Sequence, residues 1–458
     1  MTTAPQTRTH TVRDLWRIAW PVILSGLVTL FISGNDAVLL VGSSDKVLAS
    51  AVAASSIHSV AAMGVTGLGG ASQVWISRAR GAGPRGDAAR NGDTGLWLGL
   101  WGGAVSGVFL VLAGPGLLSF LSGSAIDASF AWTYLTVTVV ALPFVGIGSA
   151  LRARLAGLGQ ARGLLVASVC AAVLDVTVAI VLNQLIGPFG VAIGTIVGSI
   201  ANVLVLTWFA VRRLPEPTGV RAPRAIALIR VGGHDVRDVL ALGWPEAILY
   251  GASSGAAVVV TWLLSVGPPA ELAASRILEL TTSSIAWMVL TGIGTAATTL
   301  LGHSAGGGDL PGFRRILRHT MSFTLAIAIG ILVLGALVYL PVLGLFAPPS
   351  VLGASAPVVG LAFAQVPLMA LYVPITAALR SMKDTRTPMI ASLIAEYAVF
   401  LPLGWALTRI IVLGLIGVFI AHLVFWTASV LIVGIRLIAR IRTMTATPFT
   451  CKACRTHA

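Results

Sequence analysis

Apolar residues occur in long runs along the chain, and short polar stretches separate them. Each run has about 20 residues or more, enough to cross the roughly 30 Å hydrocarbon core of a membrane as an α-helix. None of the runs shows the alternating polarity that is typical of a transmembrane β-barrel. The pattern therefore predicts an all-α polytopic membrane protein with about twelve transmembrane helices. We place the spans near residues 18–40, 47–77, 94–121, 130–151, 163–185, 190–211, 239–265, 271–301, 319–346, 353–379, 388–408 and 412–435.

The composition agrees with a chain that is embedded in a membrane. Of its 458 residues, 56% are hydrophobic and 10% are charged, whereas about 25% of the residues of a soluble domain are charged. The first apolar run, from about Ile18, is too long for a signal-peptide core and has no small-residue cleavage pattern after it, so we expect it to stay as the first span. The tail contains one CxxC, Cys451 and Cys454, but a closed zinc site needs two further ligands, so no metal site is predicted.

The basic residues indicate how the spans are oriented. A net charge of +14 would suggest a nucleic-acid partner in a soluble protein. If the amino terminus is cytoplasmic, however, all 30 basic residues except Lys46, Arg276 and Arg409 fall in cytoplasmic segments, as the positive-inside rule requires. We therefore expect both termini in the cytoplasm and no nucleic-acid partner. The bias to Arg over Lys and to Ala and Gly is typical of a GC-rich genome and concerns the source only. We expect a multi-pass protein of a bacterial inner membrane.

The chain repeats itself across a polar segment rich in Arg, Pro and Gly. The sequence WRIAWPVILSG around Pro21 matches LALGWPEAILYG around Pro245, and further matches follow at similar offsets. Each proline removes a helical hydrogen bond, so we expect both to act as hinges. Each half contains six spans, an even number, so both halves enter the membrane from the same side. This predicts two six-helix lobes related by a pseudo-twofold axis along the membrane normal. The predicted parts are a cytoplasmic amino-terminal segment (1–17), an amino-terminal lobe (18–211), a cytoplasmic linker (212–238), a carboxy-terminal lobe (239–440) and a cytoplasmic tail (441–458).

Four motifs, three in the first half of the chain and one in the second, resemble those of the multidrug and toxic compound extrusion (MATE) family of transporters. They are GNDAVLLVG at the end of the first span, SRARGAG after the second, LRARLAGLGQAR before the fifth and LRSMKDTRTPM before the eleventh. Their order and spacing cover nearly the whole chain. The resemblance implies two six-helix lobes in a V shape and the export of varied, often cationic amphiphiles, driven by H⁺ or Na⁺.

Carboxylates inside the apolar runs mark the candidate site, because a charge in hydrocarbon is costly unless it is protonated, paired or hydrated. Asp36, next to Asn35 in the outer third of the first span, matches the first-helix Asp of the family. Asp175 lies near the middle of the fifth span, where the family usually has Asn and carries its Asp one turn later, at the position of Ala179. We expect Asp36 and Asp175 to share one proton, so that protonation displaces a bound cationic substrate.

The second half offers fewer acidic groups. Glu246 directly follows Pro245 and can serve either the site or the structure, and Gln365 can supply a neutral ligand. Many bacterial members of the family carry acidic cation ligands where this chain has Ser253 and Met369, so we expect coupling to H⁺ rather than Na⁺.

Two further carboxylates lie within the later spans. Glu279 stands three residues after Arg276, a spacing that lets the two side chains pair on one helix face. Glu396 can hydrogen-bond Tyr397 or a neighbouring helix. Neither is assigned to the site.

These features predict a secondary active exporter that works by cation antiport and alternating access. Its expected substrates are small, amphiphilic and cationic, it contacts membrane lipids, acts as a monomer, and needs no cofactor besides the coupling ion. A flippase of the same superfamily that moves a lipid-linked substrate stays open as an alternative. The chain lacks catalytic motifs such as HExxH, so we do not expect an enzyme, and the repeat suits a carrier better than a channel.

Overall fold

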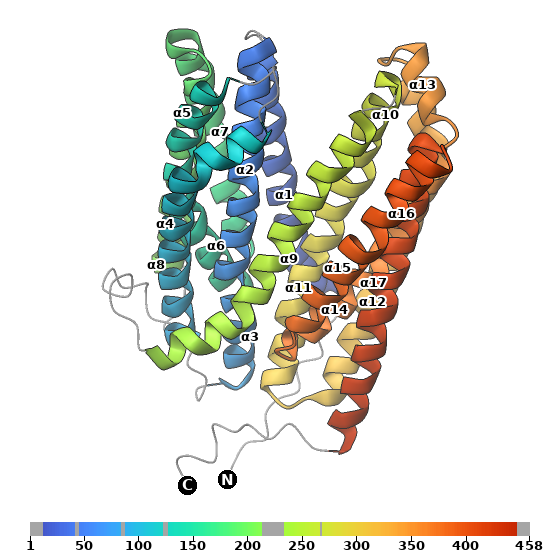
Figure 1. The fold of residues 1–458 in the computed structure, drawn as a ribbon. Helices are drawn as coiled ribbons and strands as arrows, with labels where there is room; N and C mark the ends of the chain where they lie inside the picture. Colours follow the sequence, from blue (N-terminus) through green and yellow to red (C-terminus); the bar gives the residue numbers. More distant parts are fainter. Residues whose placement is uncertain are drawn as a thin grey trace, which may run out of the picture. The chain divides into compact units, whose positions relative to one another are not determined.

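The computed structural model describes residues 12–41, 45–83, 88–121, 127–212, 233–265 and 268–446. Nearly all of them are helical, and within these ranges no residue lies in a β-strand (Figure 1). Residues 447–458 of the predicted tail, with its CxxC, and residues 213–232 of the predicted linker lie outside the described residues. The all-α class expected from the apolar runs is confirmed.

Eleven helical stretches among the described residues are long and apolar enough to cross a membrane. Each coincides with a predicted span, and the remaining predicted span, 239–265, lies within the 33-residue helix α9 (Gly233–Ser265). Some boundaries differ from the prediction. The second span is two helices, α2 (Asp45–Gly70) and α3 (Ser72–Gly81), and the tenth begins at Val359, after a short separate helix, instead of at residue 353.

The chain divides into two compact units. The unit that we call the N-unit comprises Trp20–Ser254, and the C-unit comprises the described residues up to Ala19 and from Gly255 onward. Both divisions fall inside helices, within α1 (Val12–Val41) and within α9. Pro21 and Pro245 lie inside these two helices, which continue through the prolines.

Small residues allow the helices of the N-unit to pack closely. Besides α1, α2, α3 and the first part of α9, the unit contains α4 (Ala88–Leu121), α5 (Ala128–Thr138), α6 (Leu142–Gly157), α7 (Arg162–Ile186) and α8 (Phe189–Arg212). Gly99 of α4 and Gly146 of α6 approach so closely that a Cβ atom on either would overlap the backbone of the other. Such contacts between small residues are a principal source of helix association in a membrane, where lipid tails remove most of the hydrophobic driving force.

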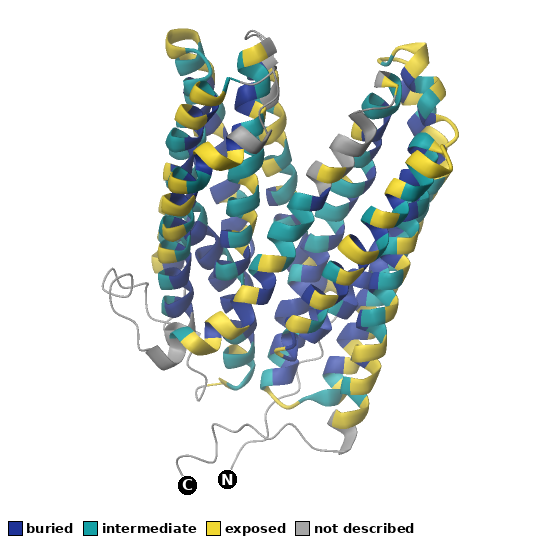
Figure 2. Cartoon of the chain, viewed as in Figure 1, coloured by how far each residue is buried: buried dark blue, intermediate teal, exposed yellow. Residues whose placement is uncertain are grey.

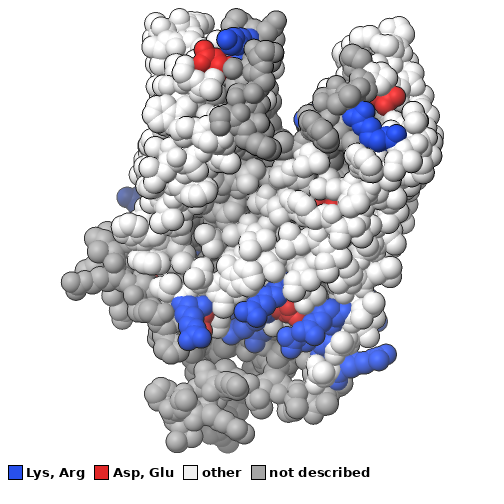
Figure 3. All heavy atoms as spheres, viewed as in Figure 1, with Lys and Arg blue, Asp and Glu red and all other residues white. Residues whose placement is uncertain are grey.

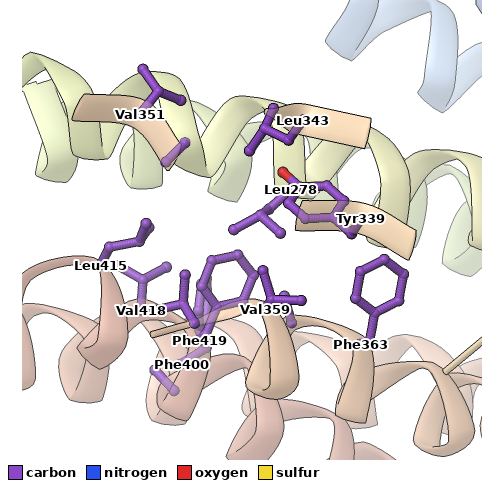
Figure 4. Close-up of a cluster of buried hydrophobic side chains, with 14 residues drawn as sticks. Leu278, Tyr339, Leu343, Val351, Val359, Phe363, Phe400, Leu415, Val418 and Phe419 are labelled. Atoms are coloured by element: carbon purple, nitrogen blue, oxygen red, sulfur yellow. The ribbon is translucent and has the colours of Figure 1, made fainter. Parts of the chain in front are cut away.

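The helices of the C-unit pack around a buried apolar core (Figure 4). Phe419 lies at its centre, close to Phe400 and Val418, while Tyr339 and Phe363 lie at one side. The unit contains α10 (Pro269–Glu279), α11 (Ala286–Gly306), α12 (Leu310–Leu343), α13 (Pro349–Ser355), α14 (Val359–Ser381), α15 (Arg386–Leu393), α16 (Leu401–Trp405) and α17 (Gly414–Ala446). Three π-helical stretches, Leu280–Ile285, Ile394–Phe400 and Ala406–Ile410, join some of these helices.

The sequence repeat is visible in the backbone where α6 and α14 end. In the N-unit, Gly159 has a φ of 77° and the next amide, of Gln160, donates to Leu155 O at 2.8 Å. In the C-unit, 224 residues later, Lys383 has a φ of 64° and the Asp384 amide donates to Leu379 O at 2.9 Å. Both helices thus end in the same left-handed turn, a position that favours glycine, and the C-unit places a lysine there.

Asp384 fixes this turn to the last helix of the C-unit. Its carboxylate accepts hydrogen bonds from the amide and hydroxyl of Thr387 at 3.2 and 2.8 Å, and it pairs with Arg436 at 3.1 Å and Arg440 at 3.5 Å. Burial of Asp384 opposes its charge, but these hydrogen bonds and the arginine charge outweigh burial, so the pKa of the carboxyl lies below its usual value. The loop that joins α14 to α15 is therefore held by a charged carboxylate.

Exposure and charge follow the pattern expected of a membrane protein. Exposed residues occur along the full length of helices in each unit as well as at their ends (Figure 2), and many of them are large and apolar. Lys and Arg gather at helix ends, and the surface between those ends is almost uncharged on the face that Figure 3 shows. The long apolar flanks are therefore suited to lipid.

Candidate functional site in the N-unit

Two hydrogen bonds fix the register of α1 and α7. Ser25 and Ser168 join their hydroxyls at 2.5 Å, and the Asn183 amide donates to Leu39 O at 3.5 Å. The partners are 143 residues apart in the first contact and 144 in the second. The helices therefore run side by side in the same direction, with a constant offset between them.

This register determines how the two candidate aspartates lie. With an offset of 143 residues, Asp175 is level with residue 32 of α1, four residues before Asp36. Four residues of helix correspond to about 6 Å along the axis. Ala179, the position at which the family usually carries its Asp, is level with Asp36 and fully buried. The two carboxylates are thus staggered by about one helical turn, and their charges still interact.

Asp175 is held against a glycine face of α8. Its side chain is only 4% exposed. A Cβ atom on Gly194 would lie 3.0 Å from one carboxylate oxygen of Asp175, and a Cβ on Gly198 would lie 2.9 Å from the other. Any larger residue at these two positions would press directly on the carboxylate. The glycines are therefore what leaves room for Asp175 between α7 and α8.

Tyr134 of α5 is a member of the site that the sequence did not indicate. Its side chain is 2% exposed, and its hydroxyl approaches that of Ser55. The charges of both Asp36 and Asp175 act on this phenol, so the three groups lie near one another. Its ring stacks with Phe130 and also packs against Phe189. A tyrosine in an apolar run resembles any core aromatic residue, and no sequence signal sets it apart.

Several buried polar atoms of α1 and α7 have no hydrogen-bond partner among the described residues. They are Asn35 Nδ2, Asp36 Oδ1, Asp175 Oδ1 and Asn183 Oδ1. An unsatisfied buried polar group costs about 1–3 kcal/mol, so each of these four atoms calls for a physical explanation. The two carboxylate oxygens can bind a proton or the cationic group of a ligand, the Asn183 oxygen can accept a hydrogen bond, and the Asn35 amide nitrogen can donate one. The sequence-predicted residues Asn35, Asp36 and Asp175 thus come together in one unit.

A half-buried arginine lies toward the other end of α1 and α7. Arg152 of α6 donates to Ser168 Oγ at 3.1 Å and to Ser25 Oγ at 3.4 Å. Its neighbour Arg154 is fully buried and pairs with Asp93 at 3.2 Å. Both arginines were predicted only to set the orientation of a loop, yet they lie inside α6 and join helices of the N-unit.

Glu246 is buried in the N-unit, at 2% exposure, but on α9 rather than α1 or α7. Gly67 of α2 lies against its backbone so closely that a Cβ atom there would come within 2.7 Å of it. This backbone contact packs α9 against α2 at the position of Glu246.

Gln365 belongs to the C-unit and lies on α14. Its side chain is fully buried, and its Nε2 donates to Thr282 Oγ1 at 3.0 Å. Thr282 lies in a π-helical stretch, a feature that often marks functional positions. Gln365 Oε1 has no partner among the described residues. Met369, one turn later, is buried as well and adds no oxygen ligand.

Two of the carboxylates predicted within spans, Glu279 and Glu396, lie in the C-unit. Arg276 and Glu279 pair at 3.6 Å, as their spacing predicted. Glu396 is 8% exposed and lies in the π-helical stretch Ile394–Phe400. Within the described ranges, no group of three or more His, Cys, Asp or Glu residues could hold a metal ion.

Comparison with protein families identifies two matching regions. The sequence model of the MatE family matches residues 21–181 and 251–406, one region in each half of the chain. A probable multidrug resistance protein NorM of Burkholderia pseudomallei is 26% identical over 420 residues, which cover 88% of this chain and 87% of that protein. The corresponding protein of Deinococcus radiodurans is 26% identical over 455 residues, covering 96% and 98%.

Solved structures show the same fold. A MATE transporter crystallised in a straight conformation superposes with a TM-score of 0.85 over 95% of this chain and 97% of that one, at 16% identity. The eukaryotic MATE transporter AtDTX14 gives a TM-score of 0.81, covering 94% and 97%, at 19% identity. At these identities the likeness concerns the fold, with its two lobes.

Proposed function

Because the chain belongs to the MatE family, we propose that it exports small amphiphilic cations by antiport with H⁺. It is a multi-pass membrane transporter rather than an enzyme. The names of its NorM relatives, which are multidrug resistance proteins, favour drugs or drug-like natural products as the exported molecules. The proposal includes H⁺ as the coupling ion, the binding site in the N-unit and the orientation of the chain in the membrane.

The observation that carries the proposal is the group of buried, unpartnered polar atoms around Asp36 and Asp175. A carboxylate in an apolar surrounding is stable when it is protonated or when a cation neutralises it. A proton and a cationic substrate therefore compete for the same carboxylates. Protonation of Asp36 or Asp175 removes the counter-ion of the substrate and favours its release, and loss of the proton on the other side restores the binding site.

Coupling to H⁺ is favoured over Na⁺ by the ligands that the site offers. A metal cation is held by several oxygen ligands at once. The C-unit offers one unpartnered amide oxygen, that of Gln365, near a buried methionine at position 369. A proton needs only a single carboxylate, so the aspartates of the N-unit suffice.

Alternating access requires parts that move relative to one another. Pro21 lies two residues after the division between the units in α1, and Pro245 lies nine residues before the division in α9. A proline inside a helix lacks one backbone hydrogen bond, so bending at these points is easier than elsewhere. We assign both prolines as hinges. We further propose a monomer in a bacterial inner membrane, surrounded by lipid, with both termini in the cytoplasm.

Efflux from liposomes tests the proposal. The purified protein is reconstituted, a fluorescent cationic dye is enclosed, and efflux is recorded under an imposed H⁺ or Na⁺ gradient. Efflux driven by H⁺, and lost in Asp36→Asn and in Asp175→Asn, is the expected result. Asp238→Asn, which alters an exposed carboxylate at the start of α9, is the matched control and should leave efflux unchanged. Efflux that depends on Na⁺, or that survives both changes, would overturn the assignment, and movement of a lipid-linked substrate without dye would favour the flippase.

A further inference from the structure

Three arginines form a hollow at the start of α12 in the C-unit, whereas the candidate transport site belongs to the N-unit. Arg314, Arg315 and Arg318 line it together with Leu310 and Pro311, and its volume is about 460 Å³. All three arginine side chains are exposed. Positions 314 and 318 are four apart and 315 and 318 are three apart, so the three guanidinium groups share one face of the helix.

None of these three arginines has an ion pair or a hydrogen bond from its side chain within the described part of the chain. Arg436 and Arg440 of α17 differ in this respect, because both pair with Asp384. The nearest acidic residue in the sequence, Asp309, caps the helix by accepting a hydrogen bond from the Gly312 amide at 2.8 Å. The hollow therefore concentrates positive charge that the described residues do not neutralise by pairing.

The same face of α12 continues as an exposed apolar stripe. Ser322 and Ala326 are exposed, and so are Ile329 (48%), Val333 (49%) and Leu337 (68%). These positions follow Arg318 at intervals of three or four residues, so they lie in line along the helix. The distance from Arg318 to Ile329 is about 16 Å at 1.5 Å per residue, close to the depth of one leaflet of a 30 Å core.

We propose that this face of α12 binds an anionic phospholipid. The phosphate of the headgroup lies in the arginine hollow, where guanidinium groups donate paired hydrogen bonds to its oxygens. An acyl chain lies along the stripe from Ser322 to Val333. A lipid can occupy the hollow with its phosphate and the stripe with its acyl chain at the same time, whereas a soluble anion can occupy only the hollow, so the two features in line favour a lipid. The binding does not depend on which molecule is transported.

Basic residues at the end of a span also set its orientation, but that role requires only charge at the correct side. It does not require three guanidinium groups on one face, a hollow between them, or an apolar stripe in line with them. Replacement of all three arginines by lysine keeps the charge, and hence the orientation, while it removes the paired hydrogen bonds. The two roles can therefore be separated by experiment.

Native mass spectrometry of the full-length protein in detergent measures the binding. Phosphatidylglycerol with long acyl chains should bind more tightly than phosphatidylcholine with the same chains, and than phosphatidylglycerol with six-carbon chains. The variant R314Q/R315Q/R318Q should bind phosphatidylglycerol at least about tenfold more weakly, because each arginine near an anionic headgroup contributes about fivefold. Arg162→Gln, at the exposed start of α7, is the control and should bind as the unmodified protein does.

The lysine variant R314K/R315K/R318K keeps the test valid if the glutamine variant does not fold. Its affinity should lie between those of the unmodified protein and the glutamine variant. Affinity for phosphatidylglycerol that is unchanged in both variants would overturn the proposal. So would equal affinity for phosphatidylcholine, or inorganic phosphate that binds as tightly as the long-chain lipid, since that would show a site for a soluble anion.

Discussion

A methyl group placed at Gly198 should disturb proton coupling while both aspartates stay in place. In the structure, a Cβ atom at this position would lie 2.8 Å from the Cβ of Asp175 and 2.9 Å from one of its carboxylate oxygens. Both distances are shorter than ordinary van der Waals contact, so Asp175 or α8 must shift. Overpacking of this kind costs about 1–3 kcal/mol. If this cost applies only to the conformation in which Asp175 packs against α8, it corresponds to a roughly 5- to 150-fold change in the coupling between proton binding and substrate binding.

The matched control for Gly198→Ala is Gly330→Ala. Gly330 lies inside α12, and an added Cβ there meets no atom within 4 Å. Alanine in a helix is favoured over glycine by roughly 0.5–1 kcal/mol, so the control should be neutral or slightly stabilising. Efflux of a cationic dye from liposomes and thermal stability in detergent are recorded for both variants. If Gly198→Ala transports as well as Gly330→Ala, the assignment of Asp175 as a tightly seated site residue is refuted.

Three further predictions concern stability, measured by thermal unfolding in detergent. Lys383→Gly should stabilise the protein by about 0.5–1 kcal/mol because glycine adopts the left-handed conformation at this position without strain. Gly159→Ala, at the equivalent turn, should destabilise the protein. Equal shifts of the melting temperature with the same sign in both variants would contradict this. Asp384→Asn should cost about 1–2 kcal/mol at pH 7 through its lost ion pairs with α17. The pKa of Asp384 is lower in the folded protein than in the unfolded chain. Its contribution to stability is therefore complete above the unfolded-state pKa of about 4 and is lost as the pH falls through the folded-state pKa. A stability difference between the unmodified protein and Asp384→Asn that persists at lower pH would contradict this. Ser168→Ala should cost about 1–3 kcal/mol because it removes the buried hydroxyl that accepts a hydrogen bond from Arg152. An unchanged melting temperature would show that the guanidinium is satisfied by other means.

The sequence predicted the spans well because their length is imposed by the membrane. It also brought Asn35, Asp36 and Asp175 into one lobe, since a carboxylate in an apolar run is conspicuous whatever the packing around it. It did not reveal the stagger of about one turn between the aspartates. That stagger depends on the register of α1 and α7, which two contacts between distant residues determine.

Other features were hidden because the residues involved resemble ordinary ones. Tyr134 looks like a core aromatic residue until the fold brings it near both aspartates. Arg152 looks like a loop arginine until its contacts with two buried serines are seen. The π-helical stretches have no sequence signature, because a wider turn depends on packing rather than on residue type. Gln365 was placed in the second half, and it lies in the C-unit; what the sequence did not show is its hydrogen bond to Thr282.

The central claim is that a proton and a cationic substrate compete for Asp36 and Asp175. It is tested most directly by proton release from the purified protein in weakly buffered detergent, recorded with a pH indicator while a cationic substrate is added. The account predicts release from the unmodified protein, and no release from the double variant D36N/D175N. Release that is undiminished in this variant would contradict the account, because the protons would then come from groups elsewhere in the chain.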